Sequence, residues 1–142
     1  MEKSLEYFKK EFQLENRDLR SYSPLTLAYL GDAVYEIMIR TSLVKKGNCA
    51  VNKLHKKASS LVKAQAQSRM IGYMEEYLTE EEYQIYKRGR NAHSPTMAKN
   101  ATMTDYRRAT GFEALVGYLY LKEDFQRLVD IIKIGLRGIT NE

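Results

Sequence analysis

The sequence contains little cysteine, proline or glycine. Cys49 is the only cysteine among 142 residues, which excludes an internal disulfide and a zinc site built from cysteines. It fits a protein of a reducing compartment, in which Cys49 is a small, partly buried residue. Only two prolines and eight glycines interrupt apolar residues that recur at i, i+3 and i+4, so we predict an all-helical fold.

The sequence also lacks any apolar run long enough to span a membrane, and its charged start, MEKSLEYFKKEF, is unlike a secretory signal. We therefore expect a cytoplasmic protein with no membrane partner. The 142 residues, of which 44% are hydrophobic and 29% charged, have the composition of one globular domain. No repeat or linker divides the chain, so residues 1–142 are predicted to form a single domain.

Acidic residues are absent from two long stretches, 37–74 and 83–104, although the net charge is only +5. These stretches carry basic residues at Arg40, Lys45, Lys46, Lys53, Lys56, Lys57, Lys63, Arg69, Lys87, Arg88, Arg90 and Lys99. Segregated positive charge attracts a polyanion such as nucleic acid through a salt-dependent interaction that carries no sequence information. A basic helix face exposed to solvent explains the pattern equally well.

Six helices are predicted, over residues 4–12, 24–44, 51–71, 79 to the RGRNA segment at 88–92, 104–121 and 123–136. Ser23 marks the start of the second helix, because serine caps a helix and the following Pro24 fits its first position. Thr79 and Glu82 form a capping box at the start of the fourth. Residues 93–103, HSPTMAKNATM, are predicted to be a mobile basic loop.

The predicted second and third helices have distinctive faces. The third has an apolar side at Val51, Leu54, Ala58, Leu61 and Val62, and an outer stripe suited to phosphates at Lys53, Lys56, Lys57, Ser60 and Lys63. The second is apolar around nearly its whole circumference over residues 25–39, which predicts burial on all sides. Either a second copy of the chain covers one side, giving a homodimer, or the other helices surround it.

Common catalytic motifs are absent: there is no GxxxxGK, GxSxG, HExxH or paired CxxC segment. His55 and His93 fit surface positions better than catalytic ones. Two acids do stand inside apolar helical runs, Asp32 in LAYLGDAVYE and Glu113 in ATGFEALVGYLYL. The carboxylate pair is therefore the remaining candidate for chemistry.

Small neighbours flank both acids. Gly31 adjoins Asp32, and Gly117 lies one turn after Glu113, so the two helices are able to cross closely with the carboxylates facing one another. Such oxygen ligands suit Mg²⁺ or Mn²⁺, whose charge offsets the repulsion between paired carboxylates. The alternative is ordinary helical ion pairing, in an Asp32, Glu36, Arg40 stripe and between Glu113 and Arg107 or Arg108. Taken alone, the residues favour ion pairs, which are far commoner than metal sites.

Four ordered blocks resemble the catalytic domain of the ribonuclease III family. They are LGDAVYE at 30–36, NKLHKKASSLV at 52–62, RGRNA at 88–92 and FEALVGYLYL at 112–121. They look most like the Mini-III ribonucleases, which consist of this domain without a double-stranded-RNA-binding domain. The resemblance covers the chain from about Pro24 to the last helix.

The resemblance implies a homodimeric, all-α endoribonuclease of ribonuclease III-like fold. It would cut double-stranded RNA rather than DNA, with Mg²⁺ or alternatively Mn²⁺, and mature the ends of precursor 23S ribosomal RNA. Asp32 and Glu113 match the family's catalytic, metal-binding acids. The candidates for RNA contacts are Lys53, Lys56, Lys57, Arg88 and Arg90.

This sequence departs from the larger family members at two acidic positions, which here hold Ala28 and Thr110. Mini-III sequences share this reduction, and Glu36 and Asp105 are the available substitutes. The missing acids leave a second hypothesis open, a non-catalytic RNA-binding module of the same fold associated with the ribosome. A third, a helical protein adaptor, fits the basic stretches less well.

Overall fold

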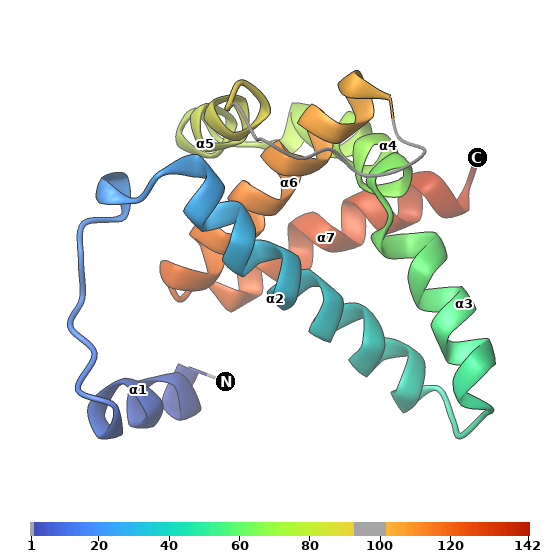
Figure 1. The fold of residues 1–142 in the computed structure, drawn as a ribbon, viewed down its shortest axis with the longest axis horizontal. Coiled ribbons are helices and arrows are strands. Elements are labelled where there is room, and N and C mark those ends of the chain that lie inside the picture. The colour runs from blue at the N-terminus through green and yellow to red at the C-terminus, as the bar shows by residue number, and fades with distance from the viewer. Residues whose placement is uncertain (1, 93–101) are drawn as a thin grey trace.

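The structure, a computed structural model, describes residues 2–92 and 102–142. All elements in these ranges are helical, as predicted (Figure 1). The predicted loop at 93–103 falls mainly on residues 93–101, which lie outside the described part. The helices are α1 (Glu2–Glu11), α2 (Pro24–Lys45), α3 (Val51–Val62), α4 (Ala64–Met74), α5 (Glu80–Arg90), α6 (Met103–Leu121) and α7 (Phe125–Thr140), with short 3₁₀ turns η1 (Leu19–Ser21) and η2 (Glu75–Tyr77).

The capping signals act where the sequence predicts them. The Ser23 hydroxyl accepts a hydrogen bond from the backbone N–H of Thr26 at 3.2 Å, with Pro24 at the first position of α2. At the start of α5, the Thr79 hydroxyl accepts from the Glu82 N–H, and the Glu82 carboxylate accepts from the Thr79 N–H. The starts of α2 and α5 are therefore determined by capping residues that adjoin them in the sequence.

The predicted third helix, 51–71, is wrong as a single element, because the chain breaks it into α3 and α4 at Lys63. Lys63 is extended, with φ −66° and ψ 156°. No glycine or proline marks the break, and side-chain hydrogen bonds stabilise it instead. The Tyr35 hydroxyl donates to the Leu61 carbonyl at 2.7 Å, and Gln67 Nε2 donates to the Val62 carbonyl at 2.9 Å. Two side-chain hydrogen bonds, one from α2 and one from the first turn of α4, thus satisfy carbonyls at the end of α3.

Helix α6 forms the centre of the core, with α2, α4 and α5 packed around it (Figure 1). Ten of its residues are buried, more than in any other described helix. Tyr35 of α2 and Phe112 of α6 are fully buried and meet edge to face, with ring centroids 5.0 Å apart. The crossing of α2 and α6 is therefore held by large side chains on both helices.

The prediction that the second helix is buried on every side is not met within one chain. Leu27 and Tyr35 are buried, but Tyr29 is 84% exposed and Ile37 56% exposed. On α3, the predicted inward residue Val51 is also 74% exposed. Both errors have one cause: apolar periodicity identifies an apolar face, but not whether a neighbouring helix covers it.

Helix α1 lies apart from the other helices and reaches α2 through a long connection (Figure 1). Its ion pair between Lys9 Nζ and Glu123 Oε2, 2.5 Å apart, ties it to the turn between α6 and α7. Within residues 2–92 and 102–142, no helix is both long enough and apolar enough to cross a membrane.

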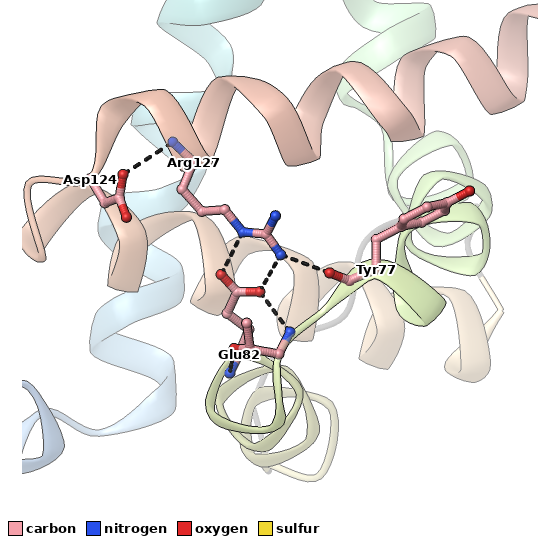
Figure 2. A network of polar contacts seen from close by, with 5 residues as sticks. Tyr77, Glu82, Asp124 and Arg127 are labelled. Atoms are coloured by element: carbon pink, nitrogen blue, oxygen red, sulfur yellow. Dashed lines mark hydrogen bonds and ion pairs between the residues drawn. The ribbon is translucent and has the colours of Figure 1, made fainter.

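A partly buried ion pair joins the starts of α5 and α7 (Figure 2). Arg127 donates from Nε and Nη2 to the two carboxylate oxygens of Glu82, at 2.8 and 2.7 Å, and also from Nη2 to the Tyr77 carbonyl at 2.7 Å. Arg127 and the Thr79 N–H hold the pKa of the Glu82 carboxyl below its usual value against the opposing effect of burial. The pair fixes the two helix ends on one side of α6.

Candidate active site

Helices α2 and α6 cross at two glycines, as the sequence predicts. A Cβ added to Gly31 would lie 1.8 Å from the backbone oxygen of Glu113, and one added to Gly117 would lie 2.1 Å from the backbone oxygen of Leu27. Real side chains do not tolerate such distances, so only glycine permits this approach. The two backbones are therefore in direct contact beside both candidate acids.

The close crossing places the carboxyl groups of Asp32 and Glu113 near enough for Asp32 to act on the pKa of Glu113. Asp32 is exposed on α2, whereas Glu113 is half-buried on α6. Burial, followed by the hydrogen bond and the negative charge of Asp32, raises the pKa of Glu113 to about 8. The Gln67 side chain acts in the opposite direction, because it favours the ionised carboxylate. Near neutral pH the metal-free protein therefore favours the protonated form of Glu113, and no cation of the protein stabilises its ionised form.

The ion pairs considered as an alternative for these acids do not form. Arg40 pairs with Glu36 at 3.4 Å, and across the described ranges neither Asp32 nor Glu113 has a cationic partner within ion-pair distance. The Arg108 guanidinium lies beside Gly72 of α4 instead, where an added Cβ would be 3.0 Å from Nη2. Helical ion pairing therefore does not explain why either acid stands in an apolar run.

No third acidic ligand joins the pair. In the part of the chain that the structure describes, no cluster of three or more His, Cys, Asp or Glu residues is suited to a metal ion. Glu36 and Asp105, the substitutes considered from sequence, therefore do not complete a larger set. The two positions that are acidic in larger relatives are small and buried: Ala28 is 7% exposed, and Thr110 is 7% exposed with its hydroxyl donating to the Tyr106 carbonyl at 3.0 Å.

Gln67 is a site residue that the sequence reading missed. It is only 2% exposed on α4, its Nε2 donates to the Val62 carbonyl at 2.9 Å, and its side chain lowers the pKa of Glu113 against the effect of burial. One signal was available, because Gln67 occupies the buried face of α4 with Ala66, Met70, Ile71 and Met74. A polar residue on the core face of an amphipathic helix requires a partner.

The RNA-contact candidates divide between two elements. On α3, Lys53, Lys56 and Lys57 are all exposed, as predicted. Lys56 lines an open groove whose other lining residues are Asn52, His55, Ser59, Ser60 and Lys63. Lys53 and Lys57 do not line this groove, so the three lysines present two different faces.

On α5, the basic candidates lie beside the central helix. Arg88 is exposed, and the guanidinium of Arg90 lies 5.6 Å from the centre of the Tyr86 ring. Gly89, between them, packs so tightly that an added Cβ would lie 2.8 Å from the Cα of Gly111. Because Gly111 is two residues before Glu113, this contact fixes the basic end of α5 against the same segment of α6.

Comparisons with known proteins agree over most of the chain. The profile of the ribonuclease III domain matches residues 25–124, a range that includes both Asp32 and Glu113. The curated Mini-ribonuclease 3 of Clostridium tetani is 53% identical over 129 residues, covering 90% of this chain and 85% of that relative. The Mini-ribonuclease 3 of a Thermoanaerobacter species is 45% identical over 140 residues, covering 98% of this chain and 99% of its own.

A solved structure shares the fold. The crystal structure of a protein from Fusobacterium nucleatum superimposes with a TM-score of 0.77 at 34% identity, covering 86% of this chain and 98% of that chain. The similarity therefore extends from the sequence blocks to the arrangement of the helices that carry them.

Proposed function

Since the chain belongs to the ribonuclease III family, in its Mini-III branch, and is an endoribonuclease, we propose that its substrate is double-stranded RNA. The observation that carries this proposal is the proximity of two carboxyl groups, Asp32 and Glu113, without a neutralising cation from the protein. The proposed cellular role, maturing the ends of precursor 23S ribosomal RNA in the cytoplasm, follows from the resemblance to Mini-III ribonucleases.

Asp32 and Glu113 fit a divalent cation of the oxygen-preferring kind. Mg²⁺ commonly uses one or two protein carboxylates, together with waters and substrate phosphates, and Mn²⁺ accepts the same ligands. The raised pKa of Glu113 supports this assignment, because a positive charge at the pair would favour the ionised form that burial and Asp32 disfavour. When bound, the cation would lower the pKa of a water molecule and stabilise charge on the attacked phosphate.

The protein's own part in the reaction is to hold two oxygen ligands at a fixed separation and to orient the duplex. The direct backbone contact of Gly31 with the Glu113 segment leaves the two carboxyl groups little freedom to move apart. In-line attack by water would leave a 5′-phosphate and a 3′-hydroxyl. Asp32 is exposed, so it is the member of the acid pair that would face the RNA.

Duplex binding is assigned to the basic residues Lys53, Lys56, Lys57, Arg88 and Arg90. A-form RNA is recognised mainly through its shape, phosphates and 2′-hydroxyls, so lysines and arginines are suitable without a base-reading motif. Affinity should fall steeply with salt, because each neutralised phosphate releases counterions.

We propose a homodimer whose interface includes the exposed apolar face of α2. An open groove beside this face is lined by apolar residues from α2, α6 and α7: Leu30, Ala33, Val34, Ile37, Met38, Tyr120 and Phe125. Exposed apolar surface of this kind is typical of protein interfaces. In a two-fold dimer the two sites would face opposite strands, so the duplex would be cut on both strands with a short 3′ overhang.

The test is to incubate the purified protein with a structured RNA duplex, first with Mg²⁺ and then with EDTA, at several salt concentrations. We expect cleavage with Mg²⁺ or Mn²⁺ only, 5′-phosphate products, and binding that weakens as salt rises. Single-stranded RNA and duplex DNA of the same sequence serve as controls. Inertness with every divalent cation would refute the proposed reaction and favour a non-catalytic RNA-binding role. A sedimentation mass equal to one chain would refute the dimer.

A further inference from the structure

An open groove runs along the outer face of α3 as far as the break at Lys63. Its lining residues, all of them exposed, are Asn52, His55, Lys56, Ser59, Ser60 and Lys63. The groove lies within residues 37–74, which contain no acidic residue. Its charge is therefore positive, and it suits a polyanion.

Neutral and basic side chains alternate along this groove. Asn52, Lys56, Ser59 and Lys63 follow one another at spacings of four, three and four residues, which is the spacing of side chains on one helix face. An RNA strand has a similar alternation, because every nucleotide carries one charged phosphate and one neutral 2′-hydroxyl group. The order of side chains in the groove therefore corresponds to the order of groups along an RNA backbone.

The two neutral side chains in this row are available to a ligand. Among the described residues, neither the Asn52 amide nor the Ser59 hydroxyl has a hydrogen-bond partner, whereas the Ser60 hydroxyl donates to the Lys57 carbonyl at 2.7 Å. An amide and a hydroxyl each donate and accept hydrogen bonds, as a 2′-hydroxyl does, but a lysine only donates. Lysines bind the phosphates of RNA and DNA alike, so Asn52 and Ser59 are the groups suited to the hydroxyl that DNA lacks.

The Lys63 end of the groove lies toward the candidate active site. Lys63 follows the last residue of α3, and the Tyr35 hydroxyl of α2 donates to the nearby Leu61 carbonyl at 2.7 Å. Tyr35 comes three residues after Asp32, so the two side chains leave α2 from adjacent turns. A strand bound along the groove would therefore lead toward the acid pair.

We propose that this groove distinguishes duplex RNA from duplex DNA, with Lys56 and Lys63 binding phosphates and with Asn52 and Ser59 binding 2′-hydroxyl groups. The inference rests on the proposed function, because it concerns how the domain recognises its duplex substrate. It also divides the lysines of α3 by role. Lys53 and Lys57 do not line the groove, so they attract any duplex through charge alone.

The test compares three duplexes of one sequence, made of RNA, 2′-fluoro RNA and DNA. The 2′-fluoro duplex keeps the A-form but lacks the hydroxyl groups, so it separates recognition of the hydroxyl from recognition of the shape. Fluorescence anisotropy at low salt gives each Kd, in EDTA to prevent the proposed cleavage. The variants of the full chain are an Asn52→Ala/Ser59→Ala double variant, Lys57→Ala, and Gln84→Ala as an exposed control on α5.

The double variant should bind duplex RNA about 10- to 30-fold more weakly than the parent protein, because two hydrogen bonds are lost. Its Kd for 2′-fluoro RNA and for DNA should stay close to the parental values. Lys57→Ala should weaken the binding of all three duplexes equally, because a phosphate contact carries no information about the sugar. Gln84→Ala should match the parent. Asn52 and Ser59 are exposed and alanine is the best helix former, so the Tm of the double variant should not fall.

Each outcome decides the inference. Equal losses for RNA and 2′-fluoro RNA would overturn it, because charge or shape would then explain the role of the groove. Unchanged RNA binding by the double variant would overturn it as well. A parent protein that binds no duplex RNA would overturn both the inference and the proposed substrate. Because binding is measured without cleavage, a parent that discriminates RNA through Asn52 and Ser59 but cuts nothing would refute the proposed reaction and support the inference.

Discussion

Glu82 and Glu113 are both covered by the core helices, yet the pKa values of their carboxyl groups move in opposite directions. Glu82 accepts hydrogen bonds from Arg127 and from the Thr79 N–H, and its pKa is lowered. Glu113 faces another carboxyl group, and its pKa is raised to about 8. The first is neutralised within the protein, as a stabilising residue must be. The second has no cation of the protein beside it, so its ionised form is disfavoured until a positive charge binds, which is the property expected of a cation ligand.

The largest expected effect is on activity at the Asp32–Glu113 pair. Asp32→Asn and Glu113→Gln keep the size of each side chain but remove its charge, so each should weaken the hold on the cation. We expect each to reduce duplex cleavage by more than about 100-fold, because even the groups that merely orient metal ligands contribute 10- to 100-fold. Single-turnover cleavage with excess enzyme measures the loss.

Glu82→Gln is the matched control, because it makes the same chemical change at the balanced carboxylate. Its cleavage rate per folded molecule should remain near that of the parent protein. The contrast between Glu113 and Glu82 would be refuted if Glu113→Gln cut RNA at the parental rate, or if Glu82→Gln lost cleavage while remaining fully folded.

The second effect is on stability at the balanced pair. Removing the charge of Glu82 leaves Arg127 inside the α5–α7 contact without its counter-charge, and weakens the capping box at Thr79 (Figure 2). We expect Glu82→Gln to lower the free energy of unfolding by about 3 kcal/mol, toward the low end for breaking a buried pair because Arg127 is partly exposed. Urea denaturation at neutral pH measures the change. An unchanged midpoint would show that Arg127 is fully satisfied by water and the Tyr77 carbonyl.

The sequence predicts the local contacts of Glu82 but not its tertiary ones. The capping box identifies the local contact of Glu82 with Thr79, because its residues are three apart and the motif is local. Arg127 lies 45 residues away and belongs to no motif, so its pairing with Glu82 depends on how α5 and α7 pack. Tertiary partners of this kind become visible only in the structure.

The same division applies to the candidate site. Asp32, Glu113 and the glycines beside them are recognisable because acids and small residues are unusual inside apolar helical runs. The break at Lys63 was not predictable, since no residue type in LVKAQAQ stops a helix. One stabilising donor, Tyr35, is 26 residues away, and the other, Gln67, reaches the Val62 carbonyl only after the chain has turned. Gln67 was missed for the same reason. When α4 is taken as a continuation of α3, the sequence does not reveal which face of α4 points toward Glu113.

The most gradual effect, small at any one pH step and spread over several pH units, is on the stability of the metal-free protein. The pKa of Glu113 is raised in the folded state, so its contribution to stability is complete below about pH 4.5 and is lost as the pH rises through about 8. The expected slope is about 1 kcal/mol of unfolding free energy per pH unit within that window. The lowered pKa of Glu82 acts with the opposite sign, because its contribution is present above pH 4.5 and is lost on acidification.

These opposite signs make the two carboxylates separable in one set of unfolding curves recorded in EDTA between pH 3 and 9. Glu113→Gln should flatten the decline from pH 5 to 8 and make the protein more stable than its parent at pH 8. Glu82→Gln should leave that decline in place and reduce the loss of stability below pH 4.5. Adding Mn²⁺ to the parent should flatten the alkaline decline as Glu113→Gln does, because a bound cation favours the ionised carboxylate. If the decline persists in Glu113→Gln, another group is responsible for it, and the contrast between the two glutamates does not extend to stability.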